Sequence, residues 1–138
     1  MMENSYLPSM NSRYDPNENG SIVLLSEYTV WVPRFNVTIT VPKGYRFDAS
    51  VPDWRLLRLL VPRKSLGKVG VCLHDFLYEH QGKLPEGACV PYRDFSKKDS
   101  DLVFLDFMKY ERVSLLRRTV AYLAVRLFGR GMWDELKP

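Results

Sequence analysis

The stretch VCLHDFLYEH, residues 71–80, determines the fold prediction, because its apolar residues recur with the period of an α-helix. Successive residues of a helix turn by about 100°, so positions three and four apart share a face. The sequence therefore predicts a helix over residues 69–80 that buries one stripe against the rest of the domain. The stripe consists of Val71, Leu73, Phe76 and Leu77.

The same predicted helix carries a candidate polar site. His74 and Tyr78 lie one turn apart and stack on each other, while Asp75 and Glu79 lie on the adjoining face. Imidazole and carboxylate groups bind divalent cations or move protons near neutral pH. For an isolated His-Asp pair, the simpler explanation is a histidine hydrogen-bonded in the core and an aspartate facing water.

Composition limits the class of protein. The chain has 138 residues of which 46% are hydrophobic, which fits one domain with a substantial core. Twenty Lys and Arg against sixteen Asp and Glu give a net charge of +4. The basic residues are scattered, so nucleic-acid binding is not indicated. The two cysteines, Cys72 and Cys89, have no CxxC spacing and are expected to be reduced thiols of a cytosolic protein.

Residues 1–20 predict a flexible N-terminal arm, because they are rich in Asn, Ser, Pro and Gly. They lack the pattern of a secretory signal, and no apolar stretch of the chain is long enough to cross a bilayer. A membrane location is therefore not expected. The arm also contains apolar side chains that could pack on a neighbouring subunit of a homo-oligomer, namely Tyr6, Leu7, Met10 and Tyr14.

Residues 21–47 predict a small antiparallel sheet. They are rich in Val, Ile, Thr, Tyr and Trp, and they divide into strands over residues 22–32 and 35–41, with a turn at Pro33-Arg34. Strict alternation over residues 37–41 places apolar side chains on one face and threonines on the other, so one face of the sheet meets water. Residues 45–47 form a third short strand or an extended segment.

A corner follows the sheet and introduces a predicted helix over residues 54–60. Asp48 and Ser50 are typical capping and turn residues, and Pro52 suits the first turn of a helix. Capping explains these residues fully. The alternative is that a carboxylate and a hydroxyl in a corner loop contribute to a ligand or catalytic site.

The chain after residue 60 predicts a basic loop, a long surface connection and a helix. Residues 63–68 form a basic loop, and residues 81–92 make a long excursion over the surface. Residues 96–99 have the S-x-x-[DE] pattern of a capping box and predict a helix over residues 97–110. Its expected apolar stripe consists of Leu102, Phe104, Leu105 and Met108, with Asp101 beside it.

Residues 114–128 predict a last helix with apolar residues around most of its surface, which indicates the most buried helix of the domain. The expected fold is therefore α+β, with a small antiparallel sheet near the N-terminus packed against three to four helices in a single domain over residues 21–138.

Four ordered motifs add a resemblance. The chain resembles the phage and prophage proteins of domain-of-unknown-function family 1353, whose pattern reads approximately T-D-x-A-S-V-P, H-D-x-L-Y, S-R-x-x-A-D-x-x-F and A-V-R-x-F-G. Phe47 replaces the usual Thr, Lys97 and Ser100 replace Arg and Ala, and residues 81–95 are an apparent insertion. The matching stretches are RFDASVP (46–52), LHDFLY (73–78), SKKDSDLVFLDFM (96–108) and AYLAVRLFG (121–129).

The resemblance implies a phage or prophage origin, in the host cytoplasm or the virion, and a shared pocket. The site that it selects consists of Asp48, Ser50, His74, Asp75, Tyr78 and Asp101. These residues meet only if the corner loop and two helices border one cleft. Asp48, His74, Asp75 and Asp101 would suit a divalent metal such as Mg, Mn or Zn, and the metal would activate water in a small hydrolase.

Two alternatives to the hydrolase remain open at the level of sequence, so the chain is not assigned as an enzyme. In the first, a non-enzymatic accessory or virion-assembly protein uses the same residues as a buried hydrogen-bond network. In the second, a protein that counters host defence binds a host partner or an anionic ligand through the basic loop at residues 63–68. The HD-class phosphohydrolases are a poor match, because they need an upstream histidine and no histidine precedes His74.

Overall fold

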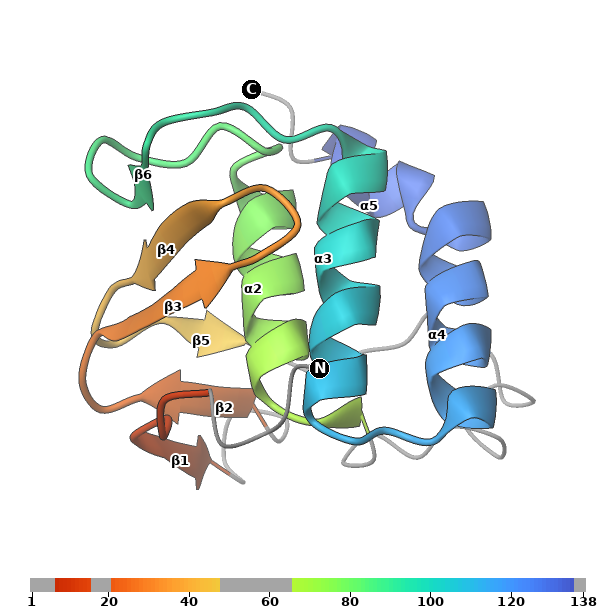
Figure 1. Cartoon of the computed structure of the whole chain (residues 1–138), viewed down its shortest axis with the longest axis horizontal. Helices are drawn as coiled ribbons and strands as arrows, with labels where there is room; N and C mark the ends of the chain where they lie inside the picture. Colours follow the sequence, from red (N-terminus) through yellow and green to blue (C-terminus); the bar gives the residue numbers. More distant parts are fainter. Residues whose placement is uncertain (1–6, 16–20, 48–65, 136–138) are drawn as a thin grey trace.

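The computed structural model describes residues 7–15, 21–47 and 66–135, and it confirms the α+β class. In Figure 1 the strands lie to one side, and the three longer helices stand side by side in the order α2, α3, α4. The strands are β1 (Ser12–Asp15), β2 (Ser21–Leu24), β3 (Tyr28–Val32), β4 (Val37–Val41), β5 (Arg46–Phe47) and β6 (Cys89–Val90). The helices are α2 (Val69–Glu79), α3 (Lys97–Tyr110), α4 (Leu115–Phe128) and α5 (Arg130–Glu135).

The strands form two three-stranded antiparallel sheets instead of the one expected. One sheet has the order β1-β2-β5 and the other β3-β4-β6. The single strand predicted over residues 22–32 is wrong, because residues 25–27 interrupt it and the chain passes there from one sheet to the other. Within the arm expected over residues 1–20, Ser12–Asp15 form the strand β1 and pair with β2, so these four residues are not irregular.

Residues 7–10 of the arm pack on their own chain. Leu7 and Met10 pack against the core, and the Tyr28 hydroxyl donates to the backbone oxygen of Pro8 over 2.8 Å. These two apolar side chains are therefore used within the subunit.

The hairpin of β3 and β4 has the predicted alternation. Tyr28 to Val32 and Val37 to Val41 point every second side chain into the core, and the intervening positions are exposed or half-buried. The turn at residues 33–36 falls where Pro33-Arg34 predicts it, and Asn36 closes it in the left-handed conformation that asparagine tolerates. The wet face of this sheet is confirmed.

Helix α2 begins and ends close to its predicted bounds and occupies the centre of the domain. It packs against α3 on one side and β5 on the other (Figure 1). Contact on two sides buries more than one stripe, so nine of its eleven residues are buried, His74 among them. Asp75 is half-buried and Glu79 is exposed.

Helix α3 confirms the capping box and, through the buried Phe104 and Met108, half of the predicted stripe. The Ser96 hydroxyl accepts from the backbone N–H of Asp99, and the Asp99 carboxylate accepts from that of Ser96. Leu102 and Leu105 are only half-buried. The helix lies between α2 and α4, so it has two covered faces, and the buried positions are Ser100, Asp101, Val103, Phe104, Asp106, Phe107 and Met108.

The expectation that residues 114–128 form the most buried helix is wrong. Helix α4 lies at the edge of the row of helices, against α3 and α5, and only Ala121 and Ala124 are buried. Four of its leucines are half or more exposed: Leu115 (68%), Leu116 (64%), Leu123 (50%) and Leu127 (69%). Contact of this much apolar surface with water is unfavourable in free energy.

The excursion over residues 81–92 contributes β6, which pairs with β4, and its Gly82 donates to Leu77 to end α2. The predicted helix over residues 54–60 lies outside the described residues, as do Asp48, Ser50 and Pro52 of the corner. Among the helices of residues 7–15, 21–47 and 66–135, none has the length and hydrophobicity needed to cross a membrane.

Candidate functional site

The Asp101 carboxylate is the centre of the candidate site. Asp101 lies in the second turn of α3, and its side chain is completely buried. An ionised carboxylate has two oxygens with about four acceptor positions between them. A buried carboxylate without partners would cost several kcal/mol, so the question is which groups satisfy it.

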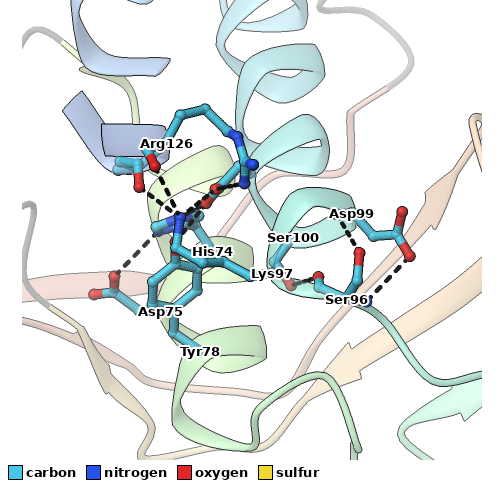
Figure 2. Close-up of polar contacts among 10 residues, drawn as sticks. His74, Asp75, Tyr78, Ser96, Lys97, Asp99, Ser100 and Arg126 are labelled. Atoms are coloured by element: carbon cyan, nitrogen blue, oxygen red, sulfur yellow. Dashed lines mark hydrogen bonds and ion pairs between the residues drawn. The ribbon is translucent and has the colours of Figure 1, made fainter. Parts of the chain in front are cut away.

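Four donors from three helices converge on this carboxylate, and Figure 2 shows their side chains, those of His74, Tyr78, Lys97 and Arg126, close together. From α2, His74 Nε2 lies 2.9 Å and the Tyr78 hydroxyl 2.6 Å from Asp101 Oδ1. From α3, Lys97 Nζ lies 3.0 Å from Oδ2, and from α4, Arg126 Nη1 lies 2.8 Å from the same oxygen.

Helical spacing aligns these donors. His74 and Tyr78 lie four residues apart on α2, and Lys97 and Asp101 lie four apart on α3, so each pair shares one face of its helix. Lys97 reaches further and donates to the backbone oxygen of Val125 over 2.7 Å. The Val125 carbonyl already accepts from the backbone N–H of Gly129, so Lys97 adds a second donor near the C-terminal end of α4, where a cation also stabilises the helix dipole.

The ionisation states follow from burial and hydrogen bonding. Burial alone would raise the pKa of Asp101, but hydrogen bonds from His74, Tyr78 and Arg126 outweigh it and lower the pKa to about 2. Burial lowers the pKa of His74 and thus favours the neutral imidazole. Because an ionised carboxylate only accepts, Nε2 of His74 carries the proton and Nδ1 has the lone pair. Burial and the hydrogen bond to Asp101 raise the pKa of Tyr78, so it stays a phenol.

Aromatic rings enclose the imidazole. The ring of His74 contacts those of Tyr78, at a centroid distance of 4.1 Å, and Phe104, at 4.7 Å. The far side of Tyr78 meets Trp133 of α5 edge-on at 5.1 Å. A Cβ on Gly129 would lie 2.8 Å from the Tyr78 hydroxyl, so a glycine there leaves room for the phenol. Only 7% of His74 is exposed.

The structure joins three of the six predicted site residues, His74, Tyr78 and Asp101. Asp75 lies beside them, with its Oδ1 4.0 Å from Nδ1 of His74 and 31% of its side chain exposed. Asp48 and Ser50 lie outside the described residues, so their predicted approach to His74 stays a prediction.

Lys97 and Arg126 bind the Asp101 carboxylate, although the sequence did not single them out as site residues. Both lie in the motif stretches SKKDSD and AVRLFG, which was the available signal. Charged residues on helix surfaces are normally solvated, and these two were therefore not selected. Their side chains reach the buried carboxylate because long basic side chains extend past the edge of their own helix.

The described part of the site does not fit a divalent metal. No group of three or more His, Cys, Asp or Glu side chains within residues 7–15, 21–47 and 66–135 is arranged to hold one. Donors already occupy both oxygens of Asp101, and two of them, Lys97 and Arg126, are cations that would repel a metal ion at this carboxylate. The metal set predicted with Asp48 therefore has no support from its described members.

The N-terminus of α2, where the sequence suggested an anion beside the basic loop, receives a carboxylate of the same chain. Glu111 accepts from the backbone N–H groups of Lys68 over 2.7 Å and Gly70 over 2.8 Å. Gly67 adopts a positive φ, and a Cβ there would collide with the Glu111 carboxylate. The anion at the N-terminus of α2 is therefore the Glu111 carboxylate of the same chain and not a bound ligand. Residues 63–65 of the loop lie outside the described residues.

Comparison with known proteins identifies the family. The sequence matches the family described as Protein of unknown function (DUF1353) over residues 22–125. The chain belongs to the DUF1353 family. The DUF1353 match contains His74, Tyr78, Lys97 and Asp101 and ends one residue before Arg126. No curated protein and no solved structure matches the chain.

Proposed function

We propose that this DUF1353 protein is a non-enzymatic accessory protein that binds a partner, and that the network around Asp101 is its internal scaffold. One observation carries the proposal: a completely buried carboxylate has all its acceptor positions filled by donors of its own chain. Such a group has no position left for a substrate, a metal or an attacking water.

The network has a clear mechanical role. It joins α2, α3 and α4 at one point, and α4 has few other large buried side chains to hold it. Alanines at its inner positions, Ala121 and Ala124, give close packing but little apolar area. The ion pair of Arg126 and the contact of Lys97 with the Val125 carbonyl therefore supply much of the attachment of α4 to α3. Fixed in this way, α4 presents its exposed leucines to a partner.

The biological setting completes the proposal. A phage or prophage origin would make the partner a virion protein or a host protein, and the protein would act in the host cytoplasm or in the virion. Both settings agree with a small domain that exposes four leucines on one helix. Protein contacts through such surfaces need no chemistry at the buried site.

The test compares thermal and urea unfolding of the wild type with His74→Ala and Asp101→Ala, each with and without a chelator. A scaffold predicts that both variants lose stability and that the chelator leaves the wild type unchanged. A catalytic or metal site predicts the reverse, with stable variants and a wild type that the chelator destabilises, because such sites are not optimised for stability. The second outcome would reject the accessory function.

A metal-independent hydrolase is the second candidate, because His74 has one feature of a general base. Asp101 fixes the neutral imidazole through Nε2–H, and Nδ1 keeps a lone pair toward the partly exposed Asp75. In this role Nδ1 would take a proton from a water that attacks a phosphoester or an amide. Turnover of a chromogenic phosphoester or anilide that disappears in a stably folded His74→Gln variant would support it, and absence of turnover in the wild type would count against it.

A further inference from the structure

The outer surface of α4 is an apolar face without a described cover. Leu116, Leu123 and Leu127, hereafter the leucine face, are each half or more exposed, and Leu115, which is also exposed, lies about 100° around the helix from Leu116. They follow one another along the helix at the edge of the row of helices (Figure 1). Four leucines that expose this much surface on one short helix exceed the scattered apolar residues of an ordinary protein surface.

The spacing along this face is that of a helix-helix contact. Leu116, Val120, Leu123 and Leu127 follow one another at intervals of four, three and four residues, which is the alternation of a heptad seam. Val120 is half-buried and packs against the edge of the core, so it joins the leucine face to the domain. A second helix laid along α4 would bury these side chains over about 20 Å of helix.

Helix α4 itself carries basic and no acidic side chains. Residues 112–133 contain five arginines and no Asp or Glu. Arg126 is bound to Asp101, but Arg112 and Arg117 are exposed and pair with no acid in the part of the chain that the structure describes. Carboxylates beside the leucine face would thus find unpaired guanidinium groups, which bind them with two parallel hydrogen bonds.

We infer that the leucine face of α4, with Arg112 and Arg117 at its N-terminal end, is the docking site for an acidic amphipathic helix of a partner protein. The inference deepens the proposed function and rests on it, because the scaffold around Asp101 holds this face in place. The partner helix carries apolar residues at heptad spacing and Asp or Glu beside them. Attraction between the opposite charges orients the partner and speeds its association.

Two other occupants fit the charge less well. A second copy of the chain would place one α4 against another and bring its arginines against arginines, which costs energy. An anionic bilayer would attract the arginines, but the heptad spacing of Leu116, Val120, Leu123 and Leu127 is that of a contact with another helix. Both occupants are separate outcomes of the test.

The test uses the full chain and two synthetic peptides of about 20 residues, long enough to form a helix. Both peptides have leucines at heptad spacing; one has Glu at the flanking positions and the other Lys. Isothermal titration should show binding of the Glu peptide that weakens as salt rises, and binding at least about tenfold weaker for the Lys peptide.

Matched variants locate the contact. The double variant Leu123→Ala with Leu127→Ala, and separately Arg117→Glu, should each weaken Glu-peptide binding by about tenfold or more. The controls Leu25→Ala and Arg13→Glu change exposed residues of the same types away from α4, and they should alter binding by less than about twofold. Circular dichroism of each variant checks that it is folded.

Four results would overturn the inference. The first two are that the Glu peptide does not bind at about 1 mM and that the two peptides bind equally well. The third is that the protein dimerises in sedimentation velocity and the double variant does not. The fourth is that the protein sediments with phosphatidylglycerol vesicles and the double variant does not. None of these results bears on the unfolding experiment with His74→Ala and Asp101→Ala. A failed docking site is therefore distinguishable from a failed scaffold.

Discussion

Replacement of Asp101 by alanine should destabilise the protein strongly, because the substitution removes the acceptor of four donors at once. The donors are not equally affected. His74 and Tyr78 are 7% and 2% exposed, so water replaces a lost acceptor poorly at these two donors. Lys97 keeps its contact with the Val125 carbonyl, and the side chain of Arg126 is 31% exposed and hydrates readily.

The magnitude follows from the two enclosed donors. A buried donor without an acceptor costs about 1–3 kcal/mol, so His74 and Tyr78 together predict a loss of about 2–6 kcal/mol in the free energy of unfolding. The total stability of a domain of this size is about 5–15 kcal/mol. Asp101→Ala should therefore remove a large part of it and loosen α4 first.

Urea unfolding monitored by circular dichroism at neutral pH measures this loss. Tyr78→Phe removes one donor and leaves the carboxylate, so it should cost about 1.5–3 kcal/mol, less than Asp101→Ala. Lys98→Ala is the matched control, because Lys98 lies on the same helix with an exposed side chain and should change stability by no more than about 0.5 kcal/mol.

A free energy of unfolding for Asp101→Ala within about 0.5 kcal/mol of that of the wild type, or above it, would contradict the scaffold role of the carboxylate. Equal stability would mean that the four donors find other partners or water. Greater stability would mean that the carboxylate is retained for chemistry at a cost to the fold.

Three further predictions concern other parts of the chain. Folding lowers the pKa of His74, so the free energy of unfolding of the wild type should be constant above about pH 6.5 and fall by up to about 1.4 kcal/mol per pH unit below it. Urea titrations at a series of pH values should show that His74→Gln lacks this slope. Gly82→Ala places a Cβ against the backbone of Phe95, whereas Gly87→Ala places one in open space at a similar positive φ. Gly87→Ala should lower the free energy of unfolding by about 1–2 kcal/mol, and Gly82→Ala should lower it several times more in thermal melts. Equal losses would contradict the contact with Phe95. Leu123→Ala should change the free energy of unfolding by less than about 1 kcal/mol, because half of the side chain is exposed, and a loss of 2–5 kcal/mol would show that it is buried.

The network around Asp101 shows how far sequence reasoning reached in the site. His74, Tyr78 and Asp101 were selected by their motifs, and they meet. Lys97 and Arg126 were not selected, although they complete the network, because nothing in a local pattern distinguishes a solvated arginine from one that reaches a carboxylate on another helix.

The sequence by itself determined the features whose cause is local. The period of residues 71–80 predicted α2, the Ser96-Asp99 pair predicted the start of α3, and the alternation of residues 37–41 predicted β4 with its wet face. Each of these depends on side chains within a few residues of one another, so the physical cause is contained in the stretch itself.

The tertiary structure alone decided which faces are covered. Helix α3 lies between α2 and α4 and buries polar residues such as Asp101 that lie outside the apolar stripe predicted from periodicity. Helix α4 is apolar around much of its surface, yet it lies at the edge and leaves Leu116 and Leu127 exposed. Periodicity reports which side chains share a face, but whether a face is buried depends on the neighbours that the whole chain places against it.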